Sequence, residues 1–179
     1  MTIKLLSDDQ GHRLGQGVKS VATALISGSV KKGRGQLAGL LRREQLYPVF
    51  QPIASLEEGA IFSHEALIRG PANTALHAPD ALLQAAAQEH LNHEFEHHCV
   101  SAALDLWGCL NRPGRLFVNI SADALLALIR QCGCDSLLSL VGVMGVSPRM
   151  LVLEITEYER VADMDQLAIV VQQVRAAGV

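Results

Sequence analysis

The feature that most constrains the fold is the alternation of strand-like runs and helical patterns in the second half of the chain. Residues 115–120 and 149–155 are apolar runs typical of strands, and a helical pattern follows each of them. Because strand, helix, strand, helix in this order builds parallel sheets, we expect an α/β fold. After the arginine that begins each run, polar residues enter only near the carboxyl ends, as Asn119 and Glu154. Barrel and open-sheet enzymes carry their functional residues at this edge.

Two earlier strand-like runs, residues 47–53 and about 60–69, are separated only by the turn at residues 55–59. A parallel crossover needs a dozen or more residues, so these two strands pair in antiparallel fashion if they pair at all. Two prolines, Pro48 and Pro52, predict that the first strand lies at an edge or at the start of the sheet.

Three functional side chains share one face of the second strand. Side chains alternate between the faces of a strand, so Glu65, Leu67 and Arg69 point the same way. A carboxylate, an apolar side chain and a guanidinium on one surface suit a metal together with a phosphate-bearing ligand.

The remaining helical patterns separate these strands. Ser121 and Asp163 are suitable first residues for two of the helices. Residues 1–35 differ from the rest, with one short amphipathic stripe and a glycine-rich basic stretch, and we interpret them as an N-terminal extension before a domain that spans 36–179. The expected helices of that domain span residues 37–46, 79–90, 92–108, 121 onward, 136–141 and 163–177.

The composition excludes several classes of protein. The formal net charge is −3 and only 4% of the 179 residues are aromatic, which argues against DNA or RNA as a partner. No run reaches the roughly 18 apolar residues of a membrane span, and charged residues interrupt the N-terminus early, so we expect a cytoplasmic protein. The four cysteines are then expected to be reduced thiols.

One local motif suggests a different chemistry. His93-Glu94-Phe95-Glu96-His97 fits the H-E-x-x-H pattern of zinc metalloproteases, in which two histidines one helical turn apart bind the metal. No third ligand follows at a recognisable spacing, and a solvated helix face is the alternative interpretation.

Four short motifs follow one another along the chain. They are Phe50-Gln51-Pro52-Ile53, Glu65-Ala66-Leu67-Ile68-Arg69-Gly70, Phe117-Val118-Asn119-Ile120-Ser121 and Leu153-Glu154-Ile155-Thr156-Glu157. In order and spacing they resemble the motifs of the EAL-domain family, whose members are bacterial phosphodiesterases that hydrolyse cyclic di-GMP to the linear dinucleotide pGpG. The resemblance implies a (β/α)8 TIM-type barrel with an antiparallel first strand, and it covers about residues 36–179.

The resemblance also implies roles for individual residues. Glu65, Asn119 and Glu154 would be ligands of Mg²⁺ or Mn²⁺, and oxygen atoms are the ligands that such hard cations prefer. The positions that would contact the substrate are Gln51, Leu67 and Arg69, the last through its guanidinium fork. Glu157 would be a carboxylate that steadies a loop over the site.

Taken singly, these residues have simpler interpretations. Glu65 could form an ion pair with Arg69, Asn119 could cap the helix that follows it, and Glu154 and Glu157 could be solvated residues beyond a strand.

The family pattern continues beyond Val179 with an Asp-Asp pair, a lysine and a further glutamate, and those positions do not occur in this chain. The chain therefore resembles the first half of the barrel, and we expect it to be inactive alone and to associate through its exposed edges. A degenerate module that binds a nucleotide or another protein, or an incomplete gene product, are the alternatives.

Overall fold

The computed structural model describes residues 35–110, 114–156 and 163–179, and the expected elements are found there within a few residues of their predicted bounds. The N-terminal extension and its amphipathic stripe lie almost wholly outside the described residues. In chain order the elements are α2 (Gln36–Arg42), β1 (Tyr47–Ala54), β2 (Ile61–Arg69), α3 (Pro79–Glu89), α4 (Asn92–Leu110), β3 (Arg115–Ser121), α5 (Ala122–Cys132), α6 (Cys134–Val143), the 3-10 turn η1 (Pro148–Met150), β4 (Leu151–Thr156) and α7 (Met164–Ala176).

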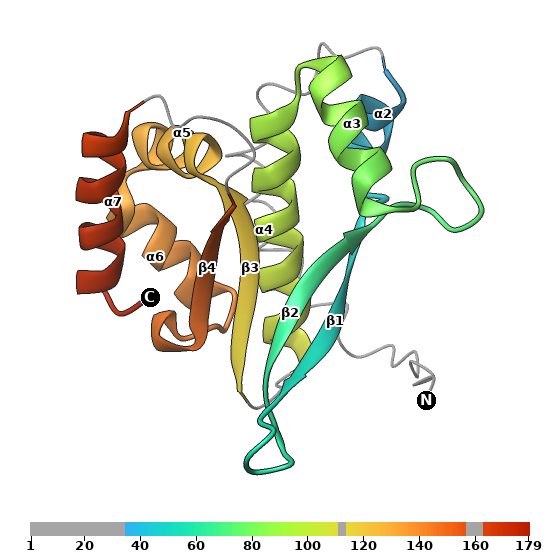
Figure 1. Ribbon diagram of the computed structural model, residues 1–179. Helices are drawn as coiled ribbons and strands as arrows, with labels where there is room; N and C mark the ends of the chain where they lie inside the picture. The colour runs from blue at the N-terminus through green and yellow to red at the C-terminus, as the bar shows by residue number, and fades with distance from the viewer. Residues whose placement is uncertain (1–34, 111–113, 157–162) are drawn as a thin grey trace.

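The four strands form one sheet in the order β1-β2-β3-β4 (Figure 1). Strands β1 and β2 pair antiparallel, with Gln51 opposite Glu65, which confirms the inference from the short turn. Strands β2, β3 and β4 run parallel to one another. Within the described residues β1 is an edge strand, as its two prolines predicted. This mixed sheet with its helices confirms the α/β fold and corresponds to the first half of a (β/α)8 barrel.

Helices cover one face of the sheet. Leu116, Val118 and Ile120 of β3 belong to the main core, together with buried residues of α4, α5, α6 and α7. Trp107 of α4 belongs to this core, and its ring packs edge-on against Phe50 at 5.0 Å between ring centroids. The alternate residues of the strands therefore face the other side, which Figure 1 presents to the viewer.

A second, smaller core lies where α2 and α3 meet the start of α4. Glu89, at the end of α3, accepts hydrogen bonds from the backbone N–H groups of Leu37 at 2.8 Å and Ala38 at 2.9 Å. A carboxylate therefore satisfies the free donors at the beginning of α2. This helix ends at Arg42 and not near Leu46 as expected, because Glu44 takes a positive φ of 51° that turns the chain toward β1.

Two further findings bear on the sequence analysis. In the part of the chain that the structure describes, no single helix has the length and hydropathy of a membrane span; α5 and α6 meet that criterion only as a pair bent by 94°. All four cysteines are free thiols, as expected.

The close approach of α4 to the turn after α6 gives a test of this packing. A β-carbon on Gly108 would lie 1.8 Å from the carbonyl oxygen of Met144, so Gly108→Ala forces the two segments apart. We expect Gly108→Ala to lower the free energy of unfolding by about 1–3 kcal/mol. Gly39 in α2 has no atom within 4 Å of such a carbon, and Gly39→Ala should raise stability by up to about 1 kcal/mol. Urea unfolding of both variants measures this; an equal effect of the two would contradict the packing.

Candidate functional site

The candidate site is built on a hydrogen bond between two neighbouring strands. Asn119 Nδ2 donates to Glu65 Oε1 at 2.8 Å, and both side chains are half-buried. Strands β2 and β3 pair from Ser63–Arg115 to Ala66–Val118, so Glu65 lies beside Phe117 and Asn119 follows two residues later on the same face. The register thus joins residues that are 54 positions apart in the sequence.

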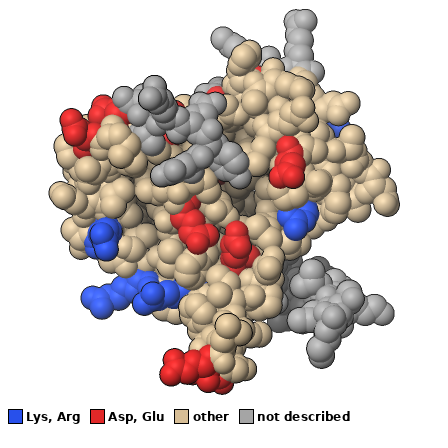
Figure 2. Space-filling model, viewed as in Figure 1, with Lys and Arg blue, Asp and Glu red and all other residues tan. Residues whose placement is uncertain are grey.

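Glu154 lies on the next strand of the same face. It is the register partner of Asn119 in the parallel pairing of β3 and β4, and it is exposed. Two carboxylates and an amide therefore occupy one face near the carboxyl ends of three consecutive strands. Figure 2 shows acidic side chains near the middle of this face, with basic side chains to either side.

The other predicted residues take different positions around this group. Gln51 is exposed and lies opposite Glu65 across the β1–β2 hairpin. Leu67 follows Glu65 on the same face and lines the cavity described below. Arg69 Nη1 donates to the carbonyl oxygen of Ile68 at 2.8 Å. The position of Glu157 lies outside the described residues.

Two of the simpler interpretations are wrong. Asn119 does not cap the following helix, because Ser121 does so by accepting the N–H of Ala124 at 3.2 Å. Glu65 does not pair with Arg69; in residues 35–110, 114–156 and 163–179 the ion pair that forms is Arg130–Asp163, at 4.0 Å.

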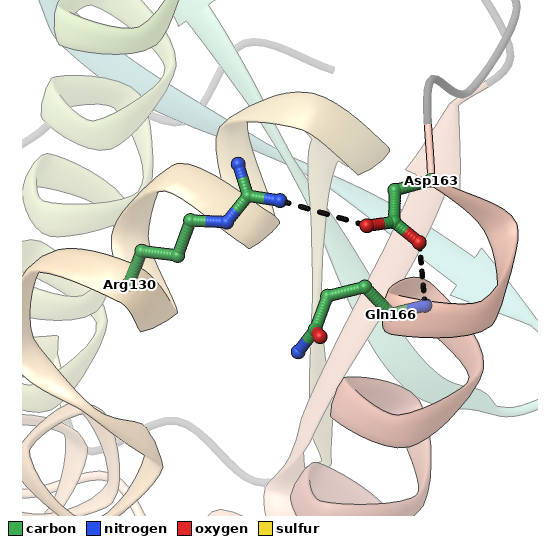
Figure 3. A network of polar contacts seen from close by, with 3 residues as sticks. All are labelled: Arg130, Asp163 and Gln166. Carbon is green, nitrogen blue, oxygen red and sulfur yellow. Dashed lines mark hydrogen bonds and ion pairs between the residues drawn. The ribbon is translucent and has the colours of Figure 1, made fainter.

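Asp163 is the residue expected to begin the last helix, and it does. Its carboxylate accepts the backbone N–H of Gln166 at 2.9 Å while it faces Arg130 of α5 (Figure 3). Both charged side chains are about half exposed or more, so the pair adds at most about 1 kcal/mol. The main contribution of Asp163 is therefore the hydrogen bond that caps α7, and the ion pair adds a weak link to α5.

A cavity of about 300 Å³ opens beside the Glu65–Asn119 pair. It lies where the pairing of β2 and β3 ends, and α3 and α4 form its far wall. The lining is mainly apolar, with three carboxylate side chains among it. The residues are Pro48, Glu65, Ala66, Leu67, Ile68, Pro79, Asp80, Leu83, Phe95, Glu96, Cys99, Ala103, Val118, Asn119, Ile120 and Thr156.

Glu96 in this lining is a residue that sequence reasoning missed. Its carboxylate accepts the backbone N–H of Ser121 through Oε2 and the Ser121 hydroxyl through Oε1, the latter at 2.8 Å. The sequence offered only the H-E-x-x-H pattern, in which Glu96 has no role. The contact joins α4 to the end of β3.

The metalloprotease hypothesis is wrong. His97 is 8% exposed, and its Nε2 donates to the carbonyl oxygen of Ala124 at 2.8 Å, which anchors it to the first turn of α5. His93 stacks on this ring, with 6.4 Å between centroids. Among the residues that the structure describes, no three His, Cys, Asp or Glu side chains form a group able to hold a metal. The motif is a structural contact between helices.

The donor set on the open face does fit a hard divalent cation, although it includes an amide. Because Asn119 donates through its nitrogen to Glu65, its Oδ1 is the atom able to bind a cation. Glu65 and Glu154 supply carboxylate oxygens, whereas the four cysteines lie on helices α4, α5 and α6 and not on the strands. Oxygen-only sets of this kind are typical of Mg²⁺, Mn²⁺ and Ca²⁺.

The chain belongs to the EAL-domain family, whose family model, described as EAL domain, matches residues 34–179. Sequence comparison with curated proteins finds no match.

Three solved structures with a similar fold contain cyclic di-GMP. Klebsiella pneumoniae BlrP1 in a manganese and cyclic di-GMP complex is 25% identical, with a TM-score of 0.63 over 75% of this chain and 33% of that one. PaMucR phosphodiesterase in complex with cyclic di-GMP is 27% identical, with a TM-score of 0.63 over 81% and 61%. The Bacillus subtilis YkuI protein, with substrate cyclic di-GMP and calcium, is 24% identical, with a TM-score of 0.65 over 81% and 37%. The chain thus spans about a third of the length of BlrP1.

The buried His97 and the half-buried His98 predict how stability varies with pH. Burial lowers the pKa of His97 and of His98 below the ordinary value of about 6.5. At a pH between the lowered pKa of the folded state and 6.5, the unfolded chain binds more protons than the folded chain does. The free energy of unfolding therefore has its full value above pH 6.5 and falls as the pH drops below it.

We expect the free energy of unfolding to be smaller at pH 5.5 than at pH 7.5, and His97→Gln to reduce that difference. Urea unfolding at both values measures it. His90→Asn is the control, since His90 is exposed and has a left-handed φ of 55° that asparagine tolerates. An unchanged pH dependence in His97→Gln would contradict the assignment.

Proposed function

We propose that the chain is an EAL-domain protein of cyclic di-GMP signalling, whose family reaction is the metal-dependent hydrolysis of cyclic di-GMP to pGpG. The observation that carries this proposal is the Glu65–Asn119 hydrogen bond with Glu154 in register beside it. The family match and the cyclic di-GMP complexes of BlrP1 and PaMucR support the choice of ligand. The cytoplasmic location expected from the sequence remains a prediction.

In this proposal the open face of the sheet binds both the cation and the dinucleotide. Glu65, Asn119 and Glu154 hold Mg²⁺ or Mn²⁺, which, when bound, would polarise the phosphodiester and lower the pKa of a water molecule. Leu67 packs against the ligand beside Glu65.

Gln51, opposite Glu65 on the exposed hairpin, donates or accepts a hydrogen bond at the ligand's edge. Arg69 pairs with a phosphate oxygen once it leaves the Ile68 carbonyl. Glu157 would steady a loop over the bound ligand.

The 179-residue chain by itself is proposed to bind and not to turn over cyclic di-GMP at a family-typical rate. Hydrolysis with two metals needs ions about 3.5–4 Å apart, held by shared carboxylates. The four strands of the described residues provide one set of oxygen donors, which consists of Glu65, Asn119 and Glu154. One set of donors is suited to hold one ion. A module that binds a nucleotide or another protein is therefore the second candidate function. Residues 1–179 contain the positions proposed to contact the ligand, but not the Asp-Asp pair and the further glutamate of the family pattern.

Calorimetry with cyclic di-GMP and Mn²⁺ tests both parts. We expect the wild-type chain to bind without releasing pGpG, and Glu65→Ala to weaken binding at least tenfold because it removes a cation ligand. Glu58→Ala on the exposed turn is the matched control and should bind as wild type does. Turnover that Glu65→Ala abolishes would refute the inactivity; absence of binding in the wild type would refute the proposed ligand.

Association of the chain is a separate expectation. The outer edge of β4 is unpaired within the described residues, and Phe117 and Val152 lie side by side, half-buried, on the open face. Such edges and faces favour self-association. Light scattering should show a dimer or larger species for the wild type and a shift toward monomer for Val152→Lys.

Ile169→Lys on the outer side of α7 is the control for added charge, because Ile169 is 50% exposed. It should leave the assembly unchanged. A monomeric wild type would count against association through the open face.

A further inference from the structure

The end of β3 is held on its two sides by different kinds of contact. Pairing with β2 stops at Ala66–Val118, whereas pairing with β4 continues through Asn119–Glu154 to Ser121–Thr156. The three residues that end β3 therefore have no ladder partner on the β2 side. The cavity opens at this gap.

The Glu96 carboxylate supplies the missing contact. One of its oxygens accepts the N–H of Ser121 and the other accepts the Ser121 hydroxyl at 2.8 Å. The hydroxyl oxygen in turn accepts the N–H of Ala124, so the same contact fixes the first turn of α5. His97, the next residue of α4, donates to the carbonyl oxygen of Ala124. Helix α4 thus clamps the strand end and the helix that follows it.

This clamp acts two residues from Asn119. If the strand end moved toward α4 or away from it, the Asn119 amide would leave the 2.8 Å contact with Glu65 and its oxygen would turn from the open face. Both oxygens of Glu96 are already occupied by Ser121, so Glu96 is suited to hold the strand and not to bind a ligand itself.

We propose that Glu96 is a positioning residue that sets the orientation of Asn119 and, through it, the affinity of the site for a divalent cation. The part that concerns the cation rests on the proposed function. The part that concerns Asn119 stands on the hydrogen bonds alone.

The experiment uses the full chain, with Mn²⁺ alone as the probe. Glu96→Gln removes one acceptor and introduces a donor toward Ser121. The matched control is Glu89→Gln, because Glu89 also accepts two backbone N–H groups but at α2, outside the cavity lining. We expect Glu96→Gln to weaken Mn²⁺ binding about ten- to a hundredfold, as loss of a residue supporting a metal ligand does. Glu89→Gln should lower stability without changing Mn²⁺ binding.

A second readout does not depend on metal. The side-chain amide resonance of Asn119, in nuclear magnetic resonance spectra without Mn²⁺, should shift in Glu96→Gln and stay in place in Glu89→Gln. Glu96→Asp, which keeps the charge but shortens the reach, serves if Glu96→Gln does not fold, and it should give the same shift.

The outcomes separate the two proposals. Unchanged Mn²⁺ binding and an unchanged Asn119 resonance in a folded Glu96 variant would overturn the positioning role and leave the proposed function intact. If the wild type binds no Mn²⁺, the proposed function fails, and the Asn119 resonance alone decides the role of Glu96. A purely structural role predicts that the Glu96 substitution lowers stability, as the Glu89 substitution does, without a selective effect on Asn119.

Discussion

The parallel register of β2 and β3 is the constraint on which the candidate site depends. It brings Glu65 beside Asn119 across 54 residues of sequence, and a slip of one residue would turn one of the two side chains to the helical face. The core enforces this register, because Val118 is 2% exposed and packs under the helices together with the partly buried Ala66. Packing on one face of the sheet therefore fixes the chemistry of the other.

Helix α4 transmits that constraint along the sheet. Near its carboxyl end Trp107 packs between Phe50 of β1 and His64 of β2, with ring centroids 5.0 and 5.2 Å away. Near its amino end Glu96 and His97 hold the junction of β3 and α5. Helix α4 thus contacts both the β1–β2 hairpin and the end of β3. The cavity lies where β2 and β3 separate.

Local signals predicted much of this arrangement. The length of the turn at residues 55–59 was enough to predict an antiparallel hairpin, and Ser121 and Asp163 begin helices as their side chains suggested. Contacts between distant segments were not predictable. Glu96 and Ser121 are 25 residues apart, and no periodicity indicates which helix face will meet a strand end. The H-E-x-x-H pattern could not show the role of His97 for the same reason, since its spacing is local but the partner of His97 is on another helix.

An amide at position 119 suits this site better than a third acid would. Glu65 accepts a hydrogen bond from Asn119 at 2.8 Å, so a carboxylate in that place would put two like charges in contact and require a shared proton or cation. Because the asparagine amide is uncharged and donates to Glu65, the contact between the two strands needs no cation to offset repulsion, and the amide oxygen remains available. Glu65 and Glu154 together carry two negative charges, which a divalent cation would balance. The two side chains can thus be oriented before a cation binds. The free energy of cation binding would then not be reduced by the cost of ordering the site.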